Sequence, residues 1–232
     1  MTESEVILEL QNVTKVYRTG EIETPALRGV NLSVSLGEFA TVVGPSGCGK
    51  TTLLNLIGGL DSPTSGMVRL DGIDLQDCPE KELAGIRLKH IGFVFQAYNL
   101  FPVLTAMENV EYVMMLQGVP SAERRRRAMD LLQAVGMAEM ARKRPVQLSG
   151  GQQQRIAVVR AISTGPRLVL ADEPTANLDS TTAAQLLDLM EQLNRERGAT
   201  FLFSTHDPRV VERAGRVIHL RDGRVVKGNS GP

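Results

Sequence analysis

The chain has 232 residues with 26 basic and 26 acidic side chains, so its formal net charge is zero. This balance argues against a nucleic-acid-binding protein that relies on bulk positive charge. Hydrophobic residues make up 42% and charged residues 22%, a globular composition that excludes disorder, collagen and coiled coil as descriptions of the whole chain. At about 150 residues per domain, the length predicts one large domain or two unequal lobes.

The cysteines and the apolar stretches bear on the compartment. Two cysteines, Cys48 and Cys78, cannot form a disulfide framework or a four-cysteine zinc site. The N-terminus shows no signal-peptide pattern. The longest apolar stretch, residues 53–60, is far shorter than the roughly 20 residues of a membrane-spanning helix. We therefore expect a soluble protein of a reducing compartment, which would need a membrane-spanning partner to act at a membrane.

The first elements in chain order are strands. Residues 6–10 and 13–17 partly alternate between apolar and polar, which predicts two short strands. Residues 39–43 form a short apolar run that ends in a glycine-rich loop, which predicts a buried strand. A helix is predicted after this loop, over residues 51–60.

The glycine-rich loop fits the pattern G-x-x-x-x-G-K-T, in which backbone N–H groups and the following helix N-terminus surround phosphate oxygens. Lys50 would reach the β- and γ-phosphates, and the Thr51 hydroxyl would bind Mg²⁺. We also expect Cys48, at a helix N-terminus beside Lys50, to be a reactive thiol that nucleotide protects. The predicted nucleotide site is Gly44, Pro45, Ser46, Gly47, Cys48, Gly49, Lys50, Thr51 and Thr52.

The middle of the chain changes character after a predicted strand at residues 91–95. Helical patterns then dominate to about residue 161, as in the helix that begins after Pro120 and places Ala128 and Leu132 on one face. We predict an α/β fold in a single domain, with a core lobe of about residues 1–96 and 162–232 and an inserted helical lobe of about residues 97–161.

Two features of the helical lobe have open interpretations. Four arginines at 124–127 are either a solvated helix face or a contact for anionic lipid headgroups. Residues 98–103, from Tyr98 to Val103, are either core packing or a groove that receives a short helix of a membrane subunit.

A second glycine pattern lies at the end of the helical lobe. Leu148 is followed by Ser149, Gly150, Gly151 and Gln152, and Ser149 suits the N-cap of a helix. This predicts a second helix N-terminus that faces phosphate. A chain that binds its nucleotide at Lys50 does not need this second site, so we expect it to serve the nucleotide of a different subunit.

The C-terminal elements carry the acidic residues. A buried strand at 168–171 ends in Asp172, which can hold Mg²⁺ through its hydration shell, and Glu173, which can take a proton from water. A helix reaches Gly198, and a strand at 200–203 precedes His206. Residues 217–220 and 225–226 flank Asp-Gly, which predicts a hairpin with a type I′ turn.

Together these segments resemble the ATP-binding cassette family, over nearly the whole chain. The resemblance rests on the phosphate loop, residues 148–152, Asp172-Glu173, Asn177-Leu178-Asp179 and His206, in the family's order and spacing. It implies an ATPase with a P-loop NTPase core sheet and an inserted helical subdomain. It also implies an ATP-dependent head-to-tail homodimer, in which each ATP lies between one subunit's phosphate loop and the other's Ser149, Gly150, Gly151 and Gln152.

The resemblance also implies roles for single residues. Tyr17 would stack on adenine, and Asp179 would cross the dimer interface, although it also suits the cap of the next helix. His90 and His219 are interpreted as structural. Catalysis would use Glu173, His206 and Gln96, and Mg²⁺ would be held by Thr51, Gln96 and Asp172.

Segments around Asn55, Gln96 and Asn109 resemble the lipoprotein-releasing and macrolide-exporter group. This implies that ATP and Mg²⁺ drive an integral membrane permease that docks near residues 98–103, with this chain peripheral on the cytoplasmic face of the inner membrane and no nucleic-acid partner. Two alternatives stay open: a non-transport cassette that controls cell-wall hydrolases through a membrane partner, and a soluble cassette in translation or DNA repair.

Overall fold

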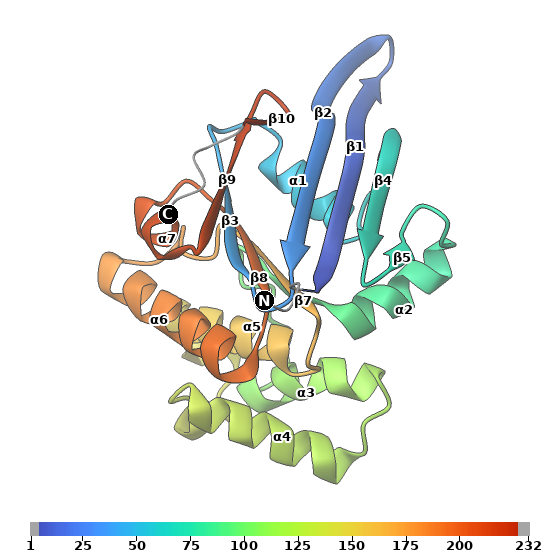
Figure 1. Cartoon of the computed structure of the whole chain (residues 1–232). Helices are drawn as coiled ribbons and strands as arrows, with labels where there is room; N and C mark the ends of the chain where they lie inside the picture. The colour runs from blue at the N-terminus through green and yellow to red at the C-terminus, as the bar shows by residue number, and fades with distance from the viewer. Residues whose placement is uncertain (1–4, 227–232) are drawn as a thin grey trace.

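The computed structural model describes residues 5–226, and in this range the strands form two sheets (Figure 1). The smaller sheet is antiparallel, with the strand order β2-β1-β4-β5. Its strands are β1 (Val6–Thr19), β2 (Ile22–Ser35), β4 (Ser65–Leu70) and β5 (Ile73–Asp74).

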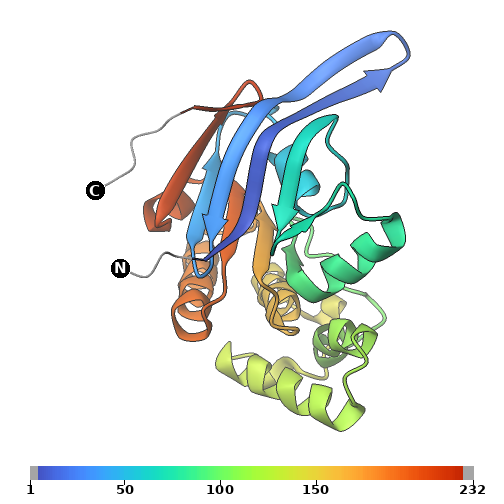
Figure 2. The same ribbon diagram turned by 45° about the vertical axis from the view of Figure 1, so that its right-hand side comes forward.

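The long β1–β2 hairpin corrects the predicted pair of short strands. Residues 6–10 and 13–17 belong to one strand, β1, whose register against β2 shifts between Leu10 and Val13. Asn12 has a φ of 48° at this bulge, and Gln11 and Asn12 are exposed, so the apolar alternation breaks there although the strand continues. Figure 2 shows the hairpin projecting beyond the other elements, at the end opposite α3 and α4.

The larger sheet has the order β10-β9-β3-β8-β7-β6, and its strand pairs are parallel except for β9 with β10. The carboxyl ends of parallel strands meet at one edge of a sheet, where α/β proteins bind ligands. The strands are β3 (Phe39–Val43), β6 (Ile91–Val94), β7 (Leu168–Asp172), β8 (Phe201–Thr205), β9 (Arg216–Arg221) and β10 (Arg224–Val226).

The helices occupy both faces of this larger sheet. One helix, α1, lies between the two sheets, and α3 to α6 cover the other face (Figure 1). The helices are α1 (Lys50–Ile57), α2 (Glu80–His90), α3 (Ala106–Leu116), α4 (Ser121–Ala134), α5 (Gly150–Ile162), α6 (Ser180–Arg197) and α7 (Pro208–Arg213), with 3₁₀ turns η1 (Ala138–Met140) and η2 (Pro145–Gln147).

Alternating side chains of the larger sheet build two separate cores. In β8, Phe201 and Phe203 pack with α3 to α6, whereas Leu202 between them packs with α1 and the antiparallel sheet. Strand β7 alternates in the same way. A strand buried on both faces reads as a continuous apolar run, which is why the sequence predicted β3, β6, β7 and β8 to within two residues.

The predicted hairpin at residues 217–226 is confirmed. Asp222 and Gly223 have φ values of 48° and 74°, as a type I′ turn requires. The helix predicted over 51–60 begins at Lys50 and ends earlier, at Ile57. In residues 5–226 no helix is long and apolar enough to cross a membrane.

Candidate nucleotide site

The phosphate loop joins β3 to α1 and curls back on itself. Gly47 and Gly49 have φ values of 77° and 107°, which residues with a side chain rarely adopt. The Lys50 ammonium donates to the carbonyl oxygens of Gly44 at 2.8 Å and Pro45 at 3.3 Å, so it lies over the hollow of the loop. The first turn of α1 has no side-chain cap, so its backbone N–H groups face the space that an anion would fill.

The C-terminal hairpin β9–β10 forms the floor of this loop. A Cβ atom at Gly44 would come within 2.1 Å of the Leu220 carbonyl oxygen. The Gly223 N–H donates to the Cys48 carbonyl at 3.1 Å. The loop therefore keeps its shape through close backbone contact with residues about 175 positions later in the chain.

Cys48 differs from the prediction of a reactive thiol. Its side chain is 4% exposed and packs in the core between the two sheets, with the loop backbone on its outer side. Only the backbone of Cys48 can therefore contact a bound nucleotide. The sequence analysis did not consider that a small apolar side chain at this position can anchor the loop to the core.

The acidic pair at the end of β7 meets the loop and β8. The Thr51 hydroxyl donates to the Asp172 carboxylate at 3.2 Å, and the Ser204 hydroxyl donates to its other oxygen. Oxygen donors of this kind suit Mg²⁺. The predicted neighbours Thr51 and Asp172 are therefore in contact, and Ser204 is an addition that the sequence reasoning missed.

Glu173 sits at a strained position beside His206. Its φ is 47°, uncommon for a residue with a side chain, and its N–H donates to the Ser204 carbonyl at 2.9 Å. One carboxylate oxygen lies 2.8 Å from His206 Nδ1, and the other accepts from the Thr205 hydroxyl at 3.3 Å. The Glu173 side chain is 16% exposed and that of His206 73%, so the pair opens to the surface.

The residues after β6 are tied to neighbouring elements. Gln96 is exposed, and its carbonyl accepts from the Asn177 amide at 2.9 Å. Tyr98 and Asn99 both have a positive φ, 56° and 49°. A Cβ atom at Gly150 would come within 2.7 Å of the Tyr98 hydroxyl, so Tyr98 packs against the start of α5 and is not a free docking side chain.

Helix α5 begins with a complete capping box. The Ser149 hydroxyl accepts from the Gln152 N–H at 3.3 Å, and the Gln152 side chain accepts from the Ser149 N–H at 2.9 Å. A Cβ atom at Gly151 would come within 2.2 Å of Thr182 Cγ2, so this glycine allows close packing on α6.

Asp179 caps α6, as one of its two predicted roles requires. Its carboxylate accepts from the N–H groups of Thr181 and Thr182, each at 3.0 Å, and from the Thr182 hydroxyl at 2.6 Å. The hydrogen bond from the Thr182 hydroxyl lowers the pKa of Asp179 below its usual value.

Tyr17 lies on β1 near the far side of the phosphate loop. It pairs with Thr24 on β2, and two residues on, the Ala26 carbonyl lies so close to Gly49 that a Cβ there would come within 2.7 Å of it. The Tyr17 hydroxyl donates to Asp61 at 3.0 Å, and the residue is 40% exposed. The Lys15 ammonium lies over one face of the ring, 4.9 Å from its centroid, so at most the other face can stack on a base.

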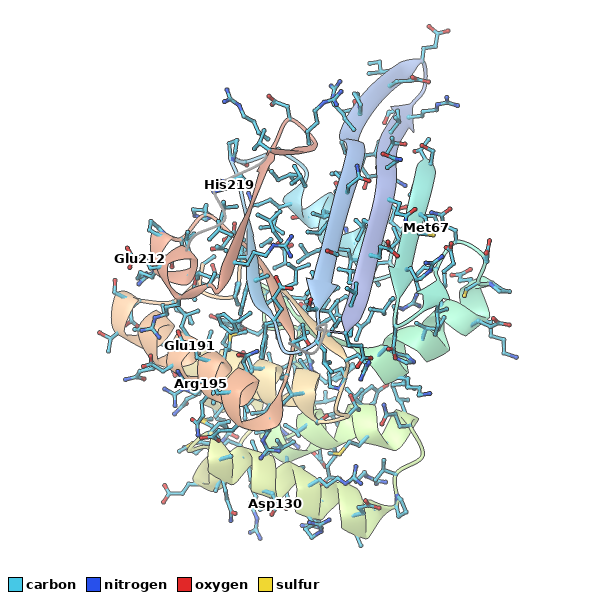
Figure 3. The ribbon with its side chains drawn as sticks, in the orientation of Figure 1. Met67, Asp130, Glu191, Arg195, Glu212 and His219 are labelled. Carbon is cyan, nitrogen blue, oxygen red and sulfur yellow. The ribbon has the colours of Figure 1, made fainter. Side chains whose placement is uncertain are left out.

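The arginines at 124–127 are largely paired within the chain. Arg124 lies 3.2 Å from Glu111, Arg126 lies 3.3 Å from Asp130, and Arg127 pairs with Glu123. Figure 3 shows Asp130 on α4, pointing away from the rest of the protein. This pairing favours a solvated helix face over a lipid contact.

Comparisons with known proteins agree with this geometry. The family model described as "ABC transporter" matches residues 27–176, more than half of the chain, and a model of an AAA domain, putative AbiEii toxin, matches residues 142–212. The lipoprotein-releasing system ATP-binding protein LolD of Anaeromyxobacter dehalogenans is 48% identical over 220 residues, which are 94% of this chain and 92% of that protein.

Two further relatives extend the comparison. The macrolide export ATP-binding/permease protein MacB of Syntrophobacter fumaroxidans is 47% identical over 97% of this chain, which spans 32% of that longer protein. The dimeric, post-hydrolysis structure of the ATP-binding cassette MJ0796 of Methanocaldococcus jannaschii, bound to ADP and Pi, is 44% identical with a TM-score of 0.89, over 97% of this chain and 100% of that one.

The chain therefore belongs to the ABC transporter family, as an ATP-binding ATPase subunit. This confirms the family, the α/β cassette fold and the enzyme class that the sequence predicted.

Proposed function

We propose that this chain hydrolyses MgATP at sites shared between two copies of itself, and that it drives an integral membrane permease of the lipoprotein-release or export type. One observation carries the proposal: the phosphate loop, the Thr51–Asp172 contact and the Glu173–His206 contact lie at one edge of the larger sheet. The names of the LolD and MacB relatives support the type of transport.

The loop and its neighbours would hold the nucleotide. The backbone of residues 44–52 and Lys50 would bind the phosphates, and Tyr17 would stack on the base. Thr51 and Asp172 fit Mg²⁺, which takes few protein ligands and completes its shell with phosphate and water; Gln96 would join them. An ion held there would supply positive charge against the β- and γ-phosphates.

Hydrolysis would rely on Glu173. Its carboxylate is anchored by Thr205 and His206 and reaches the surface, so it can accept the proton of an attacking water. His206 would contact the γ-phosphate. Phosphoryl transfer needs mainly positioning and charge stabilisation, so a site split between subunits makes turnover depend on dimer closure.

The second half of each site would come from the partner copy. Ser149, Gly150, Gly151 and Gln152 would face the partner's nucleotide, with Asp179 at the interface. The dimeric state of the MJ0796 structure supports this arrangement. We place the complex at the cytoplasmic face of the cell membrane, where a permease would hold it.

The decisive experiment is Glu173→Gln. The amide still binds water but cannot accept its proton, so ATP turnover should fall by about 10²–10⁴-fold while nucleotide binding persists. Size-exclusion chromatography with MgATP should show an accumulated dimer. The control is Glu212→Gln on the surface of α7 (Figure 3), which should behave as wild type. Turnover close to wild type in Glu173→Gln would remove Glu173 as the base.

The permease would dock beside residues 98–103. Phe101 is 40% and Val103 74% exposed. Phe101 also lines a pocket of about 240 Å³, together with Phe93, Phe95, Asn99, Val113 and Arg160 among others. Aromatic side chains beside a pocket are typical anchors of protein contacts. This surface begins two residues after Gln96, so a docked helix would be close to the nucleotide site.

Because Tyr98 packs on Gly150, the docking test uses Phe101→Ala with Val103→Ala. The double variant should fold and bind ATP but leave the membrane fraction of the native host and lose stimulation by the permease. Ile22→Ala removes an equally apolar, 70% exposed side chain at the tip of the β1–β2 hairpin and is the control. Unchanged membrane association of the double variant would exclude this docking surface.

A further inference from the structure

The segment that carries Gln96 is fixed by hydrogen bonds from side chains to its backbone carbonyl groups. It runs from Phe95 to Asn99 and includes the two positive-φ residues. Side chains donate to four of its carbonyl oxygens: Gln154 to Phe95 at 3.3 Å, Asn177 to Gln96 at 2.9 Å, and Arg160 to Tyr98 at 3.1 Å and to Asn99. Two of the three donors, Gln154 and Arg160, lie on α5, the helix that begins at Ser149.

Of these three donors, Gln154 alone also donates, among the described residues, to a carbonyl outside the segment. Its amide also donates to the Pro174 carbonyl at 2.8 Å, and its side chain is fully buried. Both acceptors are carbonyl oxygens, which only accept, so the amide nitrogen must face them. Phe95 directly precedes Gln96 and Pro174 directly follows Glu173, so one side chain of α5 joins the two segments that carry these residues.

Apolar packing alone does not account for a glutamine here. The Gln154 amide oxygen is buried without a hydrogen-bond partner in the part of the chain that the structure describes. An unpartnered buried acceptor is unfavourable, whereas a methionine would fill similar space without one. The two donated hydrogen bonds are therefore the property that the amide supplies.

We propose that Gln154 is a positioning residue that fixes Gln96 and Glu173 to α5. The groups that act on the chain's own nucleotide then move together with Ser149, which is offered to the partner's nucleotide. The inference rests on the proposed function, because it assumes that Ser149 acts across a dimer. Its consequence is that closure at one site favours closure at the other, so hydrolysis is cooperative in ATP.

The test compares Gln154→Met with Gln153→Met. Gln153 is the preceding residue of α5 and donates to the Leu148 carbonyl, within its own helix start. In Gln154→Met, kcat should fall by about tenfold or more, because misplacing reacting groups by 1 Å can cost about 100-fold. The Hill coefficient for ATP should fall to 1, while ATP affinity of the monomer changes less than about twofold. Gln153→Met should keep the wild-type kcat and Hill coefficient.

A second variant serves if the methionine protein fails to fold. Gln154→Glu keeps the shape but points a carboxylate at two carbonyl oxygens, which raises the pKa of the new carboxyl group. Once protonated it can donate to one of them, so kcat relative to wild type should recover as the pH is lowered. A role of the Gln154 side chain in packing alone predicts no such recovery, because the glutamate keeps the shape at every pH, and absence of recovery would overturn the proposal.

Measuring Glu173→Gln in parallel distinguishes failure of the proposed catalytic site from failure of the proposed role of Gln154. If Glu173→Gln retains turnover, the proposed site fails. If Glu173→Gln is inactive but Gln154→Met matches Gln153→Met in kcat and Hill coefficient, the site stands and the positioning role of Gln154 is wrong.

Discussion

The N-termini of α1 and α5 both follow or contain glycine-rich segments, yet they are capped differently. Helix α1 has no side-chain cap, and the Lys50 ammonium donates to carbonyl groups of its own loop. Helix α5 is capped by Ser149 and Gln152 of its own chain. The Ser149 hydroxyl oxygen accepts a hydrogen bond from the Gln152 N–H, so the hydroxyl hydrogen remains available to an acceptor outside the chain. One end needs an anion to complete it, and the other is complete and can donate to a ligand held elsewhere.

The largest expected effects come from substitutions at the two helix N-termini, Lys50 in α1 and Ser149 before α5. Lys50→Ala should weaken ATP binding by about 10- to 150-fold, since hydrogen bonds to charged groups contribute about 1.5–3 kcal/mol. Ser149→Arg should leave the monomer's ATP affinity within about twofold but lower turnover by about 100-fold or more, because it replaces a positioned donor with bulk. Equilibrium nucleotide binding and steady-state ATPase assays distinguish the two.

Mixing the two variants tests whether the ends act on one nucleotide across two chains. A dimer of one Lys50→Ala chain and one Ser149→Arg chain retains one intact pair, the loop of the second chain with the Ser149 of the first. Mixed dimers isolated with two affinity tags should therefore recover activity that neither parent has. No recovery would mean that the phosphate loop and Ser149 act within one chain.

A smaller expected effect is the difference in maleimide reactivity between Cys48, in the phosphate loop, and Cys78, outside it. Cys48 is buried under the loop, whereas Cys78 is partly exposed, although burial raises the pKa of its thiol. A maleimide should therefore modify Cys78 slowly and spare Cys48 with or without MgATP, until urea unfolds the chain. Mass spectrometry of peptides reads both sites. MgATP-dependent labelling of Cys48 in the folded chain would mean that the loop opens.

The smallest expected effect is on acid stability at the same edge. Hydrogen bonds from Arg209 hold the pKa of Asp207, next to His206, below its usual value. This carboxylate therefore adds stability above its unfolded pKa of about 3.9, and the gain is lost as the pH falls through the lower folded value. Asp207→Asn should lower the unfolding free energy at pH 7 by about 1 kcal/mol and flatten its decline below about pH 5.

Urea titrations at several pH values measure this effect. Asp130→Asn on the exposed face of α4 is the control and should follow the wild-type pH dependence. A wild-type pH dependence in Asp207→Asn as well would show that the ion pair with Arg209 adds nothing in solution.

The sequence predicted those elements whose signal is local. Buried strands such as β7 appear as apolar runs, and the acids that follow mark their ends. Strand β2 and helix α2 were missed: β2 carries Pro25 and Gly29 inside it, and Leu83 and Ile86 of α2 are only partly buried, so neither shows a clear period.

The contacts of the nucleotide site likewise include some that the sequence made foreseeable and some that it did not. The contacts of Thr51 with Asp172 and of Glu173 with His206 were foreseeable, because each residue follows directly on a strand or glycine loop. The roles of Ser204 and Gln154 were not, because they depend on which carbonyl and carboxylate groups the fold brings beside them. Burial of Cys48 likewise depends on the sheet packed beneath it.

The support of the phosphate loop by the β9–β10 hairpin sets an order of events during synthesis. Gly44 and Cys48 leave the ribosome early, but Leu220 and Gly223, on which the loop rests, are among the last residues translated of those described. A nascent chain that still lacks this hairpin has the complete glycine pattern and no surface to shape it. We therefore expect the loop to reach its nucleotide-binding shape only after the β9–β10 hairpin has been added.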